Sequence, residues 1–123
     1  MIQKQTLNTQ DKADVYHRLG MIKRYQAKYL EAISFFQKSV QIKEMISSIN
    51  LLDLAASYGY LALVYENIAD YSNALVYYDK IEKILEKNPN SLFLATFCNN
   101  KGVLYTNLAD YPRAKSLQET ALN

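Results

Sequence analysis

Apolar residues recur along most of this chain at intervals of three and four, which is the spacing of an amphipathic helix. Short polar stretches interrupt the pattern near Gln26, Ser47, Asp70, Asn88 and Asp110. The intervals between these interruptions predict about six helices joined by short connections. The apolar stripes of these helices contain Val15, Leu19, Ile33, Phe36, Val40, Tyr58, Leu61, Tyr65, Leu75, Tyr78, Ile81, Phe97, Leu104 and Leu108.

Residues at the interruptions supply signals for where helices begin and end. Asp70 and Asp110 stand at N-cap positions, where a carboxylate accepts hydrogen bonds from the first free N–H groups of a helix. Pro89 ends the fourth helix, because proline disfavours the helical conformation at the residue before it. Pro112 falls in the first turn of the sixth helix, where its missing N–H costs nothing.

One segment of the chain occurs twice in similar form. Residues 65–74 read YENIADYSNA, and residues 105–114 read YTNLADYPRA, which keeps six of the ten residues in place. A weaker copy lies upstream, where Ala32 stands 42 residues before Ala74, and Ala114 follows Ala74 by 40. Self-similarity at such a period is typical of repeat proteins.

The period divides the chain into successive units. Residues 1–10 are expected to form an N-terminal tail or the end of a preceding helix. Three repeats are predicted to follow, over residues 11–50, 51–90 and 91–123, and the third is short or truncated.

Composition excludes several classes of protein. Half of the 123 residues are hydrophobic, and three glycines and two prolines are too few for a disordered chain or an all-β fold. The single cysteine, Cys98, cannot form an internal disulfide, and no apolar run is long enough to span a bilayer. A net charge of +2 does not point to nucleic acid. We therefore expect a cytoplasmic protein that binds neither nucleic acid nor membrane.

The repeated units resemble the tetratricopeptide repeat (TPR), a helical hairpin with the signature W-x₂-L-G-x₂-Y, A-x₃-F and P. The matching residues are Tyr16, Leu19, Gly20, Ala32 and Phe36 in the first copy, Tyr58, Leu61, Ala62, Tyr65, Ala74 and Tyr78 in the second, and Gly102, Tyr105 and Ala114 in the third. The resemblance covers about residues 11 to 122. Lys23, Lys101 and Gln118 depart from the signature.

The period of 40–42 residues exceeds the usual ~34 of this family. In this respect the chain is similar to kinesin light-chain repeats and to the TPR arrays of bacterial sensors and regulators. The resemblance implies an all-α fold, a right-handed superhelical solenoid of three TPR-like helical hairpins. It also implies that the small residues Gly20, Ala62 and Gly102 face Ala32, Ala74 and Ala114, where paired helices come closest.

A search for catalytic chemistry finds no motif. His17 is the only histidine, and no aspartate pair has the spacing of a metal site or an acid–base pair. Cys98 occupies a large apolar position of the signature, which favours a core role over a catalytic pair with His17. The sequence has no glycine-rich phosphate loop. We therefore expect no enzyme activity, no metal and no cofactor.

The resemblance further implies a concave groove lined by the first helix of each repeat. We call the residues that it assigns there the groove positions: His17, Met21, Arg24, Tyr25, Leu63, Glu66, Asn67, Asn99, Val103, Thr106 and Asn107. Asn67 and Asn107 hold matching places, and an asparagine amide both donates and accepts, so it can pair with the backbone of an extended peptide. The alternative is that these asparagines are ordinary polar residues at helix ends.

These features favour a non-catalytic protein–protein interaction module, a scaffold or adaptor that binds a peptide segment of a partner in the groove. The alternative is a ligand- or peptide-sensing regulatory segment of a larger signalling protein. An apolar last helix also predicts end-to-end self-association, because the end repeats of an array need a polar outer face.

Overall fold

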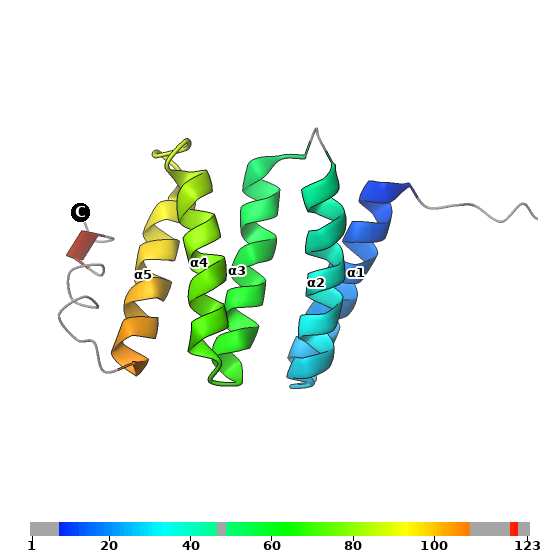
Figure 1. Ribbon diagram of the computed structural model, residues 1–123, viewed down its shortest axis with the longest axis horizontal. Helices are drawn as coiled ribbons and strands as arrows, with labels where there is room; N and C mark the ends of the chain where they lie inside the picture. Colours follow the sequence, from blue (N-terminus) through cyan, green and yellow to red (C-terminus); the bar gives the residue numbers. More distant parts are fainter. Residues whose placement is uncertain (1–7, 47–48, 109–118, 121–123) are drawn as a thin grey trace, which may run out of the picture. The chain divides into compact units, whose positions relative to one another are not determined.

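A computed structural model describes residues 8–46, 49–108 and 119–120 of the chain (Figure 1). These residues contain five long α-helices and no strand. The helices are α1 (Thr9–Tyr25), α2 (Tyr29–Met45), α3 (Leu51–Asn67), α4 (Tyr71–Leu85) and α5 (Leu92–Asn107). The chain forms two compact units, Met1–Ser57 and Tyr58–Asn123, and the boundary between them falls inside α3.

The helix boundaries follow the sequence signals closely. Asp70 caps α4 as predicted, since its Oδ1 accepts a hydrogen bond from the backbone N–H of Asn73 at 3.3 Å. Helix α4 ends at Leu85, before the predicted stop at Pro89. Helix α1 begins at Thr9, two residues earlier than the apolar pattern indicates, because Asn8 supplies the cap. The predicted sixth helix, with its cap at residue 110 and its proline at residue 112, lies almost entirely outside the described residues.

The first helical hairpin, α1 with α2, has small residues and one aromatic ring at its centre. Ala13, Ala32 and Phe36 are buried, and Ser39 of α2 donates a hydrogen bond to the carbonyl oxygen of Ala13 at 2.7 Å. A Cβ atom added to Gly20 would lie 2.7 Å from Cδ1 of Phe36. The three atoms nearest to that added Cβ all belong to the Phe36 ring. The glycine therefore makes room for an aromatic side chain.

The two turns that follow α1 and α3 have the same backbone conformation. Ala27 and Ala69, 42 residues apart, are both left-handed, with φ of 58° and 61°. In the first turn Lys28 N–H donates to the Lys23 carbonyl at 2.8 Å, and the same bond forms after α3. This is a Schellman motif, which satisfies the free carbonyls at a helix end and reverses the chain. The repeat period therefore extends to the turns.

An aromatic pair with a lysine above it also recurs at this period. In the first unit Tyr16 stacks on Phe35 with ring centroids 6.3 Å apart, and Lys38 Nζ lies 5.6 Å from each centroid. In the second unit Tyr58, Tyr77 and Lys80 form the same arrangement, with Lys80 Nζ 5.3 Å and 5.6 Å from the two rings. Cation–π attraction of this kind contributes about 0.5–1 kcal/mol at exposed sites.

The second unit is joined further by aromatic and ionic contacts. Tyr65 of α3 stacks on Tyr77 of α4 with centroids 5.8 Å apart. Lys101 of α5 pairs with Glu82 at 3.0 Å and with Asp79 at 3.5 Å, both on α4. These pairs connect α4 to α5 across an exposed edge. Among the described helices, none is long and apolar enough to cross a membrane.

Candidate functional site

The groove positions of the first unit lie along one face of α1. His17, Met21 and Arg24 are four and three residues apart, which places them on consecutive turns of the helix. All three are partly exposed. Tyr25, the last residue of α1, is exposed at the hairpin turn. His17, Met21 and Arg24 therefore form a continuous row on α1, and each side chain is partly buried and partly accessible to solvent.

His17 sits in a mixed environment at the start of this row. Its ring lies 5.3 Å from the Phe36 ring, tilted by 56°. Burial lowers the pKa of His17, and the positive charge of Lys43 lowers it further, whereas Asp53 and Asp14 act in the opposite direction. The imidazole is consequently neutral near pH 7, where it can both donate and accept a hydrogen bond.

Arg24 is a half-buried cation at the other end of the row. Its Nε atom is shielded from solvent and has no hydrogen-bond partner among the described residues. A buried donor without an acceptor costs about 1–3 kcal/mol. The side chain as a whole is partly exposed, so a carboxylate brought by a ligand can pair with the guanidinium charge.

In the second unit the groove positions lie near the end of α3. Leu63 and Glu66 are partly buried, and Asn67 is the exposed last residue of the helix. The hydroxyl of Tyr78 on α4 donates a hydrogen bond to Oε1 of Glu66 at 2.8 Å. Burial raises the pKa of Glu66, and the hydrogen bond from Tyr78 partly offsets this. Burial also raises the pKa of the Tyr78 hydroxyl, which therefore remains a donor.

This environment gives a testable pH dependence. Because the pKa of Glu66 is raised in the folded protein, its stabilising contribution is present at acid pH and is lost as the pH rises above the ordinary value of 4.5. Glu66→Gln keeps the acceptor for Tyr78 without the charge. We expect the variant to gain stability relative to the parent between pH 4.5 and neutral pH, by no more than about 1 kcal/mol since Glu66 is partly exposed.

Urea denaturation of both proteins across this range measures the difference. Glu86→Gln, at an exposed position after α4, is the matched control and should show no such trend. Parallel pH profiles for the Glu66→Gln variant and the parent would contradict the expectation.

The remaining groove positions lie on α5. Asn99 and Thr106 are exposed, and Val103 is 40% exposed. The hydroxyl of Thr106 donates back to the carbonyl oxygen of Gly102 at 3.0 Å, within its own helix. Asn107 is the last residue of α5, as Asn67 is of α3, and its side chain lies outside the described atoms. Both predicted asparagines are therefore at helix C-termini.

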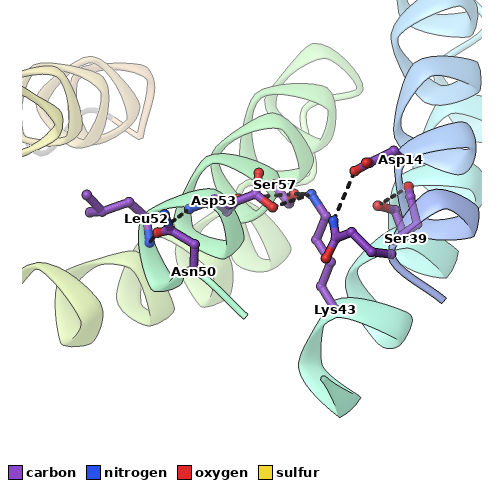
Figure 2. Close-up of polar contacts among 9 residues, drawn as sticks. Asp14, Ser39, Lys43, Asn50, Leu52, Asp53 and Ser57 are labelled. Atoms are coloured by element: carbon purple, nitrogen blue, oxygen red, sulfur yellow. Dashed lines mark hydrogen bonds and ion pairs between the residues drawn. The ribbon is translucent and has the colours of Figure 1, made fainter. Parts of the chain in front are cut away.

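Sequence reasoning missed a buried polar cluster in the first unit (Figure 2). Lys43 of α2 is only 2% exposed, and its Nζ donates to the Ser57 hydroxyl at 2.8 Å and pairs with an Asp53 carboxylate oxygen at 3.3 Å. Ser57 and Asp53 both lie on α3, so this lysine joins α2 to the start of the next helix. The sequence signal that could have revealed this cluster is the position of Lys43, because its charge interrupts the apolar stripe formed by Phe36 and Val40.

The Lys43–Ser57 contact does not provide a nucleophile for a substrate. Ser57 is 1% exposed, so its hydroxyl cannot be approached from solvent. The Lys43 ammonium group is shielded from solvent, and its positive charge is balanced by the Asp53 carboxylate. The cluster is therefore a structural connection. Within the described ranges, no group of three or more histidine, cysteine, aspartate or glutamate residues is placed to hold a metal ion.

Comparison with known proteins identifies the class of this protein. The tetratricopeptide repeat family matches residues 11–87, which is more than half of the chain, so this chain belongs to that family. No curated protein matches the sequence. The resemblance to the family that the sequence motifs indicated is confirmed.

Solved structures support the same fold. BtubC (BKLC) from P. vanneervenii aligns with a TM-score of 0.78 and 20% identity, over 93% of this chain and 46% of its own length. The N-terminal domain of stress-induced protein-1 (STI-1) from C. elegans aligns with a TM-score of 0.74 and 14% identity, over 95% of this chain and 87% of that one. This chain thus spans about half the length of BtubC. The predicted all-α fold of TPR-like hairpins is confirmed.

Proposed function

We propose that this chain is a non-catalytic interaction module that binds a peptide segment of a partner protein at the groove positions of α1, α3 and α5. Proteins of the family generally bind other proteins, and the positions in question are partly or fully exposed wherever the structure describes their side chains. The observation that carries the proposal is Arg24, a partly exposed cation that lies in line with His17 and Met21 on one face of α1.

The chemistry of these positions defines the ligand. A peptide carboxylate would pair with Arg24, while His17 on the same face of α1 stays neutral near pH 7 and adds no charge beside it. The exposed amides of Asn67 and Asn99 would bind backbone groups whatever the peptide sequence. The ligand is therefore an extended segment that carries one acidic residue.

Binding of selected peptides tests this proposal. Short random peptides displayed on phage are selected on the full chain, and the captured sequences are then titrated at low and high ionic strength. Arg24→Ala should weaken binding about tenfold at low salt and less at high salt, because the interaction with the carboxylate is screened. Asn67→Ala should weaken binding at both salt concentrations, since hydrogen bonds between neutral groups are not screened.

Arg18→Ala is the matched control for Arg24→Ala. Arg18 is an exposed arginine on the same helix, but it lies away from the row formed by His17, Met21 and Arg24. Its replacement should leave the affinity unchanged. If peptides bind and neither Arg24→Ala nor Asn67→Ala affects them, the binding surface lies elsewhere on the molecule and the proposal fails.

A further inference from the structure

Contacts between α1 and α2 show that the two helices run antiparallel. Ser39 of α2 donates to the carbonyl oxygen of Ala13 at 2.7 Å, and the Phe36 ring lies 5.3 Å from the His17 ring. A step back along α2, from Ser39 to Phe36, therefore corresponds to a step forward along α1, from Ala13 to His17. This register determines which side chains of the hairpin can meet.

The register brings the side chains of His17 and Lys43 toward each other. Side chains on an α-helix lean toward its N-terminus, and antiparallel helices have their N-termini at opposite ends. His17 therefore leans toward Ala13, and Lys43 leans back toward Ser39, which is bonded to Ala13. The positive charge of Lys43 accordingly acts on the imidazole and lowers the pKa of His17.

Among the described residues, three charged groups act on this imidazole, and they come from three helices. Asp14 lies one turn before His17 on α1, Lys43 belongs to α2, and Asp53 belongs to α3. Lys43 is at the centre of the cluster, because its Nζ also pairs with Asp53 at 3.3 Å and donates to Ser57 at 2.8 Å (Figure 2). The imidazole is therefore adjacent to the group that connects α2 to α3.

A proton on His17 would place charge where water has little access. The ring packs on Phe36, which is 1% exposed, and the Nδ1 atom of His17 is shielded from solvent. An imidazolium carries an N–H at both ring nitrogens, so part of its charge would be desolvated. Burial and Lys43 together hold the pKa of His17 below its ordinary value of 6.5, and they outweigh the opposite effects of Asp53 and Asp14.

We propose that His17 makes the first unit sensitive to mild acid. Its protonation adds a second positive charge beside Lys43 and thereby weakens the connection of α2 to Ser57 and Asp53 of α3. Because the pKa of His17 is lower in the folded than in the unfolded protein, the stabilisation is present in full above about pH 6.5 and is lost as the pH falls below it. This role involves contacts within the first unit and is independent of peptide binding.

Titration of the imidazole tests the environment of His17 directly. His17 is the only histidine of the chain, so its ring signals can be followed by NMR without ambiguity, between about pH 8 and pH 5. The midpoint should lie below 6.5 in the parent. Lys43→Met should raise it, because methionine keeps most of the buried chain but removes the repulsive charge. Lys38→Met, at an exposed position of the same helix, is the matched control and should leave the midpoint unchanged.

A double-mutant cycle at two pH values tests the effect on the connection. The change in melting temperature caused by Lys43→Met is measured at about pH 7.5 and about pH 5.5, in the parent and in His17→Gln. In the parent, Lys43→Met should become more favourable at the lower pH, by about 3 °C, because it then relieves the repulsion from the imidazolium. In His17→Gln the effect of Lys43→Met should be the same at both pH values.

Each of three results would overturn the proposal. The imidazole of the folded parent could titrate at 6.5 or above, or Lys43→Met could leave its midpoint unchanged. The effect of Lys43→Met could also vary with pH equally with and without His17, in which case another group is responsible. If His17→Gln does not fold, Asp14→Asn replaces it in the cycle. Loss of this carboxylate should lower the midpoint of His17 and shift the change in the Lys43→Met effect to lower pH, and the absence of both shifts would refute the proposal.

Discussion

Gly20→Ala should lower the free energy of unfolding by about 2 kcal/mol, although the same exchange in an open helix interior stabilises a protein by up to about 1 kcal/mol. The added Cβ would lie 2.7 Å from Cδ1 and 2.8 Å from Cε1 of Phe36. That ring is 1% exposed and enclosed by the first hairpin, so it cannot turn away without displacing its neighbours. Urea denaturation followed by circular dichroism measures the loss.

Gly59→Ala is the matched control, because it introduces the same methyl group into α3. Its Cβ would meet Cδ1 of Ile81 at 3.8 Å, an ordinary van der Waals contact. Helix propensity should then dominate and stabilise the protein by about 0.5–1 kcal/mol. Phe36→Leu should partly rescue Gly20→Ala, so that the double variant is more stable than the sum of the single effects predicts. Additive effects would show that Gly20 and Phe36 are not coupled.

Lys43→Ala should lower the free energy of unfolding by about 2–3 kcal/mol. The substitution removes a buried alkyl chain and leaves the Ser57 hydroxyl and the Asp53 carboxylate without their shared donor. Asp53 is half exposed and can be rehydrated, which keeps the loss below that of a fully buried pair. Thermal and urea denaturation both measure the effect.

Lys43→Met separates packing from charge at the same position. Methionine keeps most of the buried chain and avoids the cost of removing an ammonium group from water, so this variant should unfold within about 1 kcal/mol of the parent. Lys83→Met, at an exposed position of α4, is the control and should change stability by less than about 0.5 kcal/mol. Equal losses for Lys43→Met and Lys43→Ala would mean that the ion pair, and not the packing, holds α2 to α3.

Local signals in the sequence were sufficient to predict the helices and the family. The cap at Asp70 acts on the first turn of its own helix, and the proline after α4 acts on the residue before it, so both effects can be recognised without the fold. The repeat period gave the register of the hairpins, because equivalent residues must make equivalent contacts. The paired turns at Ala27 and Ala69 follow that register.

The groove positions could be proposed from the sequence only through resemblance to the family. Their spacing on α1 follows from helical geometry, but the shielded Nε of Arg24 and the contact between Glu66 and Tyr78 depend on side-chain directions that the sequence does not specify. The binding role of these residues stays a proposal, which the peptide titrations address.

The sequence by itself determined the helices, their order, the repeat period and the TPR class, since all of these depend on interactions within a few residues or on repetition of a pattern. Only the tertiary structure decided that Gly20 makes room for Phe36 and that Lys43 is buried against Asp53 and Ser57. The physical reason is that a side chain's neighbours across helices depend on how the helices pack, and periodicity gives only the face on which that side chain lies.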